Sequence, residues 1–230
     1  MEHWVYTTNI FGQSVSVNVD TVLTMWLSML LLIVLALFTT RKLDMVPGKL
    51  QLVGENIIKY FNNISKASMG NDEAQKHIAI ILTLFMFILT ANLVGQLPFK
   101  LIHLAHGELA SPNNDINMTA AMAVVVSIYY IFYGVKRNGF KFFFKGFTID
   151  GIIVTLVDTL ELFVRPFSLA LRLFANILAG ELLVATFVSL VAVIVPLPFM
   201  LFELFVALIQ ALVFTLLSTT YISMAVQEEH

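Results

Sequence analysis

Long apolar segments, separated by short polar ones, form the main pattern along this chain. A transmembrane helix needs about 20 apolar residues to cross about 30 Å of hydrocarbon. Three segments have the length of single spans, at residues 21–40, 78–97 and 117–135. A fourth apolar region covers residues 150–226. Pro196 and Pro198 interrupt this region, and because proline removes a helix donor, we predict a bend near residues 195–198.

The two helices of this last region are too long for an upright span. At 1.5 Å per residue, residues 150–194 would extend roughly 68 Å and residues 199–226 roughly 42 Å. Tilting relieves such a mismatch. We therefore predict an all-α membrane protein, one polytopic domain over residues 1–230, in which upright helices accompany a long, strongly tilted, membrane-embedded helical hairpin. The alternative is that two short helices, joined at Pro166 or around Gly180, replace the first long one.

The basic residues predict an orientation in the membrane. Most of them lie between the first and second spans or after the third, and Lys100 is the one in the intervening loop. Because cytoplasmic loops carry an excess of Lys and Arg, we expect residues 1–20 outside and the C-terminus in the cytoplasm. Residues 48–66 alternate apolar and polar side chains at helical spacing. They are expected to form an amphipathic helix on the inner face.

Composition agrees with a lipid environment and limits the chemistry. Hydrophobic residues make up 59% of the 230 residues and charged residues 12%, whereas soluble domains carry about 25% charged residues. The net charge of −2 and the absence of cysteine argue against a nucleic-acid partner and against a Cys-based metal site. His103 and His106 are three residues apart in the outer loop, a spacing that can suit a metal. No further ligand accompanies them, so we favour ordinary loop polarity and expect no cofactor.

Six ionisable side chains lie inside the last apolar region, where a charge costs at least about 2.5–3.5 kcal/mol on insertion scales. They are Asp158, Glu161, Arg165, Arg172, Glu181 and Glu203. An intramembrane ionisable residue is a functional hypothesis by default. Polar residues three or four positions apart also form a stripe on one helix face, within an arc of roughly 80°. Its members are Asp158, Glu161, Arg165, Ser168, Arg172 and Asn176.

Arg172 is the cation in this stripe that lacks an obvious partner. Glu161 and Arg165 are four residues apart and can pair. Arg172 has no acid three or four residues away, so its counter-charge is expected from another helix or another chain. Glu181 follows nine residues later, about 180° around an ideal helix, and therefore faces away from Arg172.

The acids form two groups, one toward the inside and one near the outer bend. They are Asp158 and Glu161 on the inside, and Glu181 and Glu203 on the outside. On the last helix, Glu203 and Gln210 are seven residues apart and share one side. Two acidic groups separated by a single arginine are the arrangement expected of two offset half-channels with a positive barrier between them.

Structural roles are the alternatives for these residues. Asp158 could mark a helix start, and Ser168 could bond a carbonyl of the preceding turn. Asn176 and Gln210 could form interhelical hydrogen bonds. Arg165 could pair with Glu161 or snorkel, and Glu203 could be a protonated buried acid. For Arg172 the alternative is a purely structural pairing.

Three segments, in order along the chain, resemble a known family. Residues 165–181 read RPFSLALRLFANILAGE, which resembles S-L-x-x-R-L-F-G-N-x-x-A-G/D-E, the signature segment of ATP synthase subunit a. Residues 208–224, LIQALVFTLLSTTYISM, resemble the last helix of that family. Residues 92–98, NLVGQLP, resemble its N-L-x-G-x-x-P segment. The order and spacing of these motifs cover nearly the whole chain.

The resemblance implies a role for each matched position. Arg172 aligns with the essential arginine that faces the carboxylates of the rotating c-ring, and Gln210 aligns with the glutamine opposite it. Asn176 and Glu181 align with polar residues of the proton path. Glu203 takes a position where some members carry histidine. The sequence departs from the family motif at two positions: Ala175 stands where glycine is usual, and Arg165 where lysine is common. Neither position is the essential arginine.

The resemblance implies a stator subunit of the Fo sector of F-type ATP synthase, which couples proton translocation to ATP synthesis and is not catalytic on its own. The implied partners are the c-ring, peripheral-stalk subunit b, the remaining ATP synthase subunits and the lipid bilayer. The residues expected to carry protons are Arg172, Glu181, Glu203, Gln210, Asn176, Glu161, Asp158 and Ser168. Arg165 and Asn92 are expected to have structural, pairing roles. The short N-terminus without a presequence predicts a bacterial plasma membrane protein.

Three other functions stay open from the residues alone. A secondary transporter or ion channel would use the intramembrane charges as a substrate site, although such folds often show inverted repeats and none is visible. An intramembrane enzyme is disfavoured because the sequence contains neither H-E-x-x-H nor G-x-S-x-G. A structural scaffold would tolerate the loss of Arg172.

Overall fold

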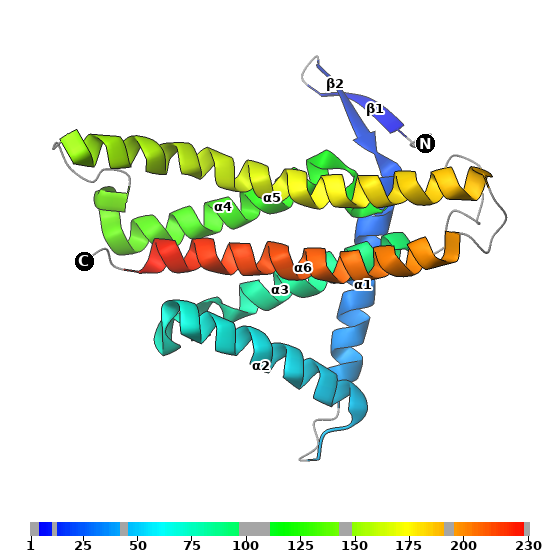
Figure 1. The fold of residues 1–230 in the computed structure, drawn as a ribbon, viewed down its shortest axis with the longest axis horizontal. Helices are drawn as coiled ribbons and strands as arrows, with labels where there is room; N and C mark the ends of the chain where they lie inside the picture. The colour runs from blue at the N-terminus through cyan, green and yellow to red at the C-terminus, as the bar shows by residue number, and fades with distance from the viewer. Residues whose placement is uncertain are drawn as a thin grey trace. The chain divides into compact units, whose positions relative to one another are not determined.

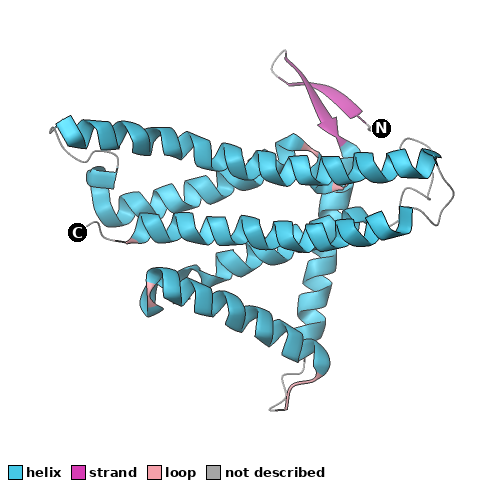
Figure 2. Cartoon of the chain, viewed as in Figure 1, coloured by secondary structure: helices cyan, strands magenta, loops and turns pink. Residues whose placement is uncertain are grey.

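The chain is built from helices, with one short pair of strands near its start (Figures 1 and 2). The computed structural model describes residues 5–10, 13–41, 46–96, 111–142, 149–190 and 196–227. The long helices are α1 (Val19–Thr40), α2 (Lys49–Met69), α3 (Asn71–Gln96), α4 (Ile116–Asn138), α5 (Ile149–Leu190) and α6 (Pro196–Val226). Short 3-10 turns, η2 (Pro112–Asn114) and η3 (Gly139–Phe142), precede and follow α4.

Among the described residues, five helices are long and apolar enough to cross a membrane. They are α1, α3 and α4 over their whole lengths, residues Ile153–Val184 of α5, and residues Pro198–Val226 of α6. The prediction of an all-α membrane protein is therefore confirmed. The strong tilt of the last two helices stays a prediction.

Two antiparallel strands, which the sequence analysis did not predict, precede α1. Strand β1 (Val5–Ile10) pairs with β2 (Gln13–Asn18), so that Val5 lies opposite Asn18 and Ile10 opposite Gln13. The signal was present in the segment QSVSVN, where polar and β-branched residues alternate with a period of two. The search for long apolar segments passes over strands of this length.

Helix α1 has its polar side chains buried and its apolar side chains exposed. Thr24 and Ser28, at 2% and 0% exposure, donate their hydroxyl groups to backbone carbonyls one turn earlier. Trp26 and Phe38 are 66% and 68% exposed. Such an apolar exterior is stable in lipid rather than in water, because transferring apolar surface out of water is favourable.

The chain divides into two compact units, each assembled from three stretches. The first contains residues Met1–Lys42, Met86–Met118 and Phe174–Ala211, and the second contains Leu43–Phe85, Thr119–Leu173 and Leu212–His230. In the second unit, Phe61 of α2 is 1% exposed and its ring centroid lies 4.7 Å from that of Phe85 on α3. On another face of α2, Leu50 and Val53 are 70% and 57% exposed. These exposed side chains agree with an amphipathic helix.

Helix α5 is continuous from Ile149 to Leu190, with Pro166 inside it. Of the two alternatives drawn from the sequence, the single long helix is therefore the correct one. Its 42 residues correspond to about 63 Å, and the 31 residues of α6 to about 46 Å. Pro196 and Pro198 lie in the first turn of α6, where a missing backbone N–H is tolerated. Residues 191–195, which include the start of the predicted bend, lie outside the described residues.

Candidate functional site

In the second unit, the first part of the polar stripe on α5 contains an ion pair. The Arg165 guanidinium donates to the carboxylate of Glu161, one turn earlier, as the spacing predicts. The same guanidinium lies over the ring of Tyr221 on α6, 5.1 Å from the ring centroid. A carboxylate and an aromatic face together hold this cation, so Arg165 connects α5 to the last turns of α6. Asp158 and Ser168 are half-buried on the same helix.

Arg172 differs from Arg165 in its surroundings. It is exposed on α5. Within the described part of the chain, no hydrogen bond or ion pair involves its side chain. A guanidinium is always charged in proteins, and a charge facing lipid is costly. The surface around Arg172 is therefore suited to an acidic group from outside the described chain.

In the first unit, Glu181 of α5 is nearly fully buried, at 3% exposure. The side-chain amide of Asn114 donates to its Oε2 over 2.7 Å, and the backbone N–H of Ser111 donates to its Oε1 over 3.4 Å. Both donors belong to residues 111–115, which include η2 and lead into α4. Each oxygen of this carboxylate therefore receives a neutral donor from the same short segment.

The same segment is attached to two further helices of the unit. Asn113, fully buried, donates its side-chain amide to Asn92 Oδ1 of α3 over 2.7 Å. Asn92 in turn donates to the backbone carbonyl of Ala207 on α6 over 3.1 Å. Asn92 therefore connects three elements of the unit. This geometry agrees with the pairing role expected for Asn92.

Glu203 of α6 lies against the backbone of α5 at Gly180. A Cβ atom added to Gly180 would lie 2.4 Å from Glu203 Oε1, which is far inside contact distance. The carboxylate can occupy this place only because residue 180 has no side chain. Gly180 directly precedes Glu181, so the two outer acids of the sequence analysis come from adjacent places in one unit.

One turn of α6 beyond Ala207, the amide groups of Asn176 and Gln210 meet. The Asn176 amide donates to Gln210 Oε1, and Gln210 is 2% exposed. This bond joins α5 to α6, as the alternative of interhelical hydrogen bonding predicted. It leaves the Gln210 Nε2 donor without a hydrogen-bond partner among the described residues.

Several buried polar atoms of the first unit have no partner in the part of the chain that is described. They are Ser111 Oγ, Asn113 Oδ1, Glu203 Oε1 and Gln210 Nε2. A buried polar group that is left unsatisfied costs about 1–3 kcal/mol, and buried water commonly satisfies such groups. Together with the two carboxylates, these atoms make a polar interior that is suited to passing protons.

Sequence reasoning missed the contribution of residues 111–115. It treated residues 98–114 as an ordinary outer loop and named none of Ser111, Asn113 or Asn114. The run S-P-N-N-D, directly before an apolar span, was the available signal, because Asn and Asp at a turn hydrogen-bond readily. His103 and His106 lie outside the described residues. Among the residues that are described, no group of three or more possible metal ligands is found.

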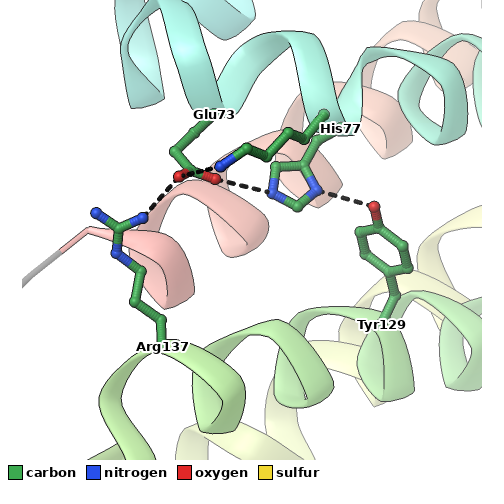
Figure 3. Close-up of polar contacts among 5 residues, drawn as sticks. Glu73, His77, Tyr129 and Arg137 are labelled. Atoms are coloured by element: carbon green, nitrogen blue, oxygen red, sulfur yellow. Dashed lines mark hydrogen bonds and ion pairs between the residues drawn. The ribbon is translucent and has the colours of Figure 1, made fainter.

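A second polar cluster lies in the other unit, between α3 and α4 (Figure 3). Glu73 accepts from Lys76 over 2.9 Å and from Arg137 over 2.6 Å. The fully buried His77 has its Nε2 3.7 Å from Glu73, and a 2.8 Å hydrogen bond joins its Nδ1 to the Tyr129 hydroxyl. This cluster, which the sequence analysis did not name, fastens the start of α3 to α4.

Comparison with known proteins identifies the family of the chain. The family model for the ATP synthase A chain matches residues 22–223. A similar protein is ATP synthase subunit a of Gloeobacter violaceus, which is 43% identical over 213 residues, covering 93% of this chain and 86% of that protein. The family match includes every polar residue of α5 and α6 described above.

Proposed function

This chain belongs to the ATP synthase A chain family and is a stator subunit of an Fo sector, and from that premise we propose that α5 and α6 line two proton half-channels with Arg172 as the barrier between them. The observation that carries this proposal is the exposed Arg172 guanidinium, which has no partner in the described chain. Family membership places the chain in an ATP synthase rather than among the secondary transporters.

The outer half-channel is formed by Glu181 and Glu203. Both carboxylates belong to one unit, in which Ser111 Oγ, Asn113 Oδ1 and Glu203 Oε1 lack hydrogen-bond partners among the described residues. Such atoms favour water, and water next to carboxylates can relay a proton. Asn176 lies between Arg172 and Glu181 on α5, and its partner Gln210 follows Glu203 on α6.

The inner half-channel is formed by Asp158 and Glu161, with Ser168 on the same helix face. Arg165 is bound to Glu161 and to the ring of Tyr221, so it serves as a structural cation. Arg172 is then the cation of α5 that remains available to a partner from another chain.

The proposed partner is a ring of c subunits whose carboxylates pass Arg172. Next to a permanent positive charge the ionised carboxylate is favoured, whereas in lipid desolvation favours the protonated one. A proton that enters past Glu203 and Glu181 neutralises one carboxylate, which lets that subunit rotate into lipid. The next subunit arrives protonated and releases its proton toward Glu161. Moving one charge through the membrane potential is worth about 2.3 kcal/mol per 100 mV.

The lengths of the last two helices support a strong tilt. About 63 Å of α5 and about 46 Å of α6 must fit a hydrocarbon layer of about 30 Å. Helices that lie far from the membrane normal can follow the curved surface of a ring along much of their length. We also propose the remaining assignments from the sequence: subunit b as a partner, no catalysis by this chain alone, and a bacterial plasma membrane with the N-terminus outside.

The experiment is the substitution Arg172→Ala in the assembled complex, reconstituted in vesicles. We expect ATP synthesis driven by a proton gradient to be abolished, because c-ring carboxylates lose the charge that ionises them and the barrier to leakage is removed. Arg41→Ala is the matched control, since Arg41 is an exposed arginine just after α1, and it should synthesise ATP at the normal rate. Normal synthesis by the Arg172→Ala complex would overturn the proposal.

A further inference from the structure

Residues 111–115 are short, yet consecutive side chains in this segment bind different parts of the first unit. Asn113 binds Asn92 of α3, and Asn114 binds Glu181 of α5. The Asp115 carboxylate accepts from Asn18, at the end of β2, over 2.7 Å. Three successive residues therefore contact three different elements. The contacts of Asn113 and Asp115 on either side restrict the movement of Asn114.

The close approach of this segment to α3 depends on Gly95. A Cβ added there would lie 2.3 Å from Ser111 Cβ and 3.0 Å from Ser111 Cα. Residue 111 therefore packs directly on the helix backbone, and its own backbone N–H points at Glu181 Oε1. The segment thus brings two donors to the carboxylate from one side, and its attachment to α3 fixes their direction.

We propose that Asn114 is a positioning residue for proton entry: together with the Ser111 N–H it orients the Glu181 carboxylate and stabilises its ionised form, so that Glu181 is ready to accept a proton from outside. This inference rests on the proposed role of Glu181 in the outer half-channel. Hydrogen bonds from neutral donors to a carboxylate are charge-assisted and short, as the 2.7 Å bond from Asn114 is.

Neutral donors suit a group that must be protonated and deprotonated in each cycle. A cation beside Glu181 would favour the ionised form strongly and would hold back protonation. An unassisted buried carboxyl group would stay protonated and would not accept a proton at all. The Asn114 amide and the Ser111 N–H, the donors to Glu181 among the described residues, lie between these extremes, and Asn114 supplies the shorter bond.

The test measures passive proton flux through the reconstituted complex, driven by a fixed potassium diffusion potential, while the pH on each face is varied separately. Asn114→Ala should reach half-maximal flux at an external proton concentration about tenfold lower, because the ionised carboxylate loses one charge-assisted hydrogen bond. The dependence on internal pH should not change. The amount of assembled complex is measured by mass spectrometry, and flux is given per complex.

Asn117→Ala is the matched control. Asn117 is exposed and hydrogen-bonds to Asp115 rather than to Glu181, so the external pH profile of the Asn117→Ala complex should equal that of the unchanged complex. If Asn114→Ala does not assemble, Asn114→Ser is used; its shorter hydroxyl side chain should give a smaller shift in the same direction.

The outcomes separate this inference from the proposed function. If Glu181→Gln leaves proton flux unchanged, the outer half-channel itself is wrong and the role of Asn114 falls with it. If Glu181→Gln slows flux but the assembled Asn114 variant keeps the normal external pH profile, the inference alone is wrong. A lower maximal flux without a shift of the profile would show that Asn114 only supports the fold, and would also overturn the inference.

Discussion

Each of the two units contains a polar cluster around one carboxylate, and the clusters differ in burial and in what surrounds the carboxylate. Glu73, between α3 and α4, contacts two cations, Lys76 and Arg137. Glu181 receives donors from a neutral amide and a backbone N–H. A carboxylate between two cations is held in its ionised form, so it fastens helices. A carboxylate with neutral donors can change its protonation state at lower cost.

The atoms next to the two carboxylates, Glu181 and Glu73, differ as well. Beside Glu181, the unit contains Ser111 Oγ, Asn113 Oδ1 and Glu203 Oε1 without partners among the described residues. Beside Glu73, the His77 ring packs edge-on against Tyr133, with 4.6 Å between centroids, and is bonded to Tyr129. His77 Nε2 also lacks a hydrogen-bond partner among the described residues, so the clusters differ in the aromatic rings packed on His77 rather than in unpartnered atoms alone. Polar composition alone does not distinguish a proton path from a structural connection.

The largest expected difference comes from neutralising each carboxylate. Glu181→Gln should lower passive proton flux about 100-fold, the scale on which a proton-transfer group contributes. Glu73→Gln should leave flux per assembled complex within about twofold, because Glu73 contacts two cations and belongs to neither proposed half-channel. The measurement is flux at equal amounts of complex. Equal losses in the two variants would remove the distinction between the clusters.

Gly180→Ala should give the next largest effect. The added Cβ would lie 2.4 Å from Glu203 Oε1, so the carboxylate must turn away while the helix stays intact. Misplacing a reacting group by about 1 Å costs up to about 100-fold, and we expect flux to fall about tenfold with normal assembly. In a background of Glu203→Ala, which removes the displaced carboxylate, adding Gly180→Ala should cause little further loss. A full further loss would show that Gly180 acts independently of Glu203.

Arg137→Ala should have the smallest effect and should act on stability alone. It removes one of two cations from Glu73, and a partly exposed ion pair contributes up to about 1 kcal/mol. For a protein of this size we expect the melting temperature of the complex to fall by about 2–4 °C, with unchanged flux per complex. Thermal unfolding followed by circular dichroism measures the shift. A change in the pH profile of flux would place the Glu73 cluster in the proton path.

The fold class followed from the sequence because lipid imposes a length on apolar helices. The five candidate spans need only local composition to be found. The continuity of α5 was one of two open alternatives, since Pro166 can end a helix or lie within it. The β1–β2 pair was missed because its alternation is short and has no long apolar segment.

Part of the site could also be predicted from local composition. Charges inside an apolar helix are conspicuous, so the acids and arginines of α5 and α6 could be named directly. Asn113 and Asn114 are ordinary in an outer loop, and their importance depends on which helices they meet in the folded chain. Glu73 and Arg137 lie near helix ends, where charge is common, so only their contact across 64 positions distinguishes them.

The unbroken helix α5 has a mechanical consequence. Pro166 has no backbone N–H to donate, but between Arg172 and Glu181 the helix contains neither a proline nor a loop that could absorb a displacement. A force that a passing c-ring exerts on Arg172 would therefore act on a stiff helix rather than on a flexible loop. A helix loaded in this way returns to its place after each step of the proposed rotation, so the distance along α5 between Arg172 and Glu181 stays constant.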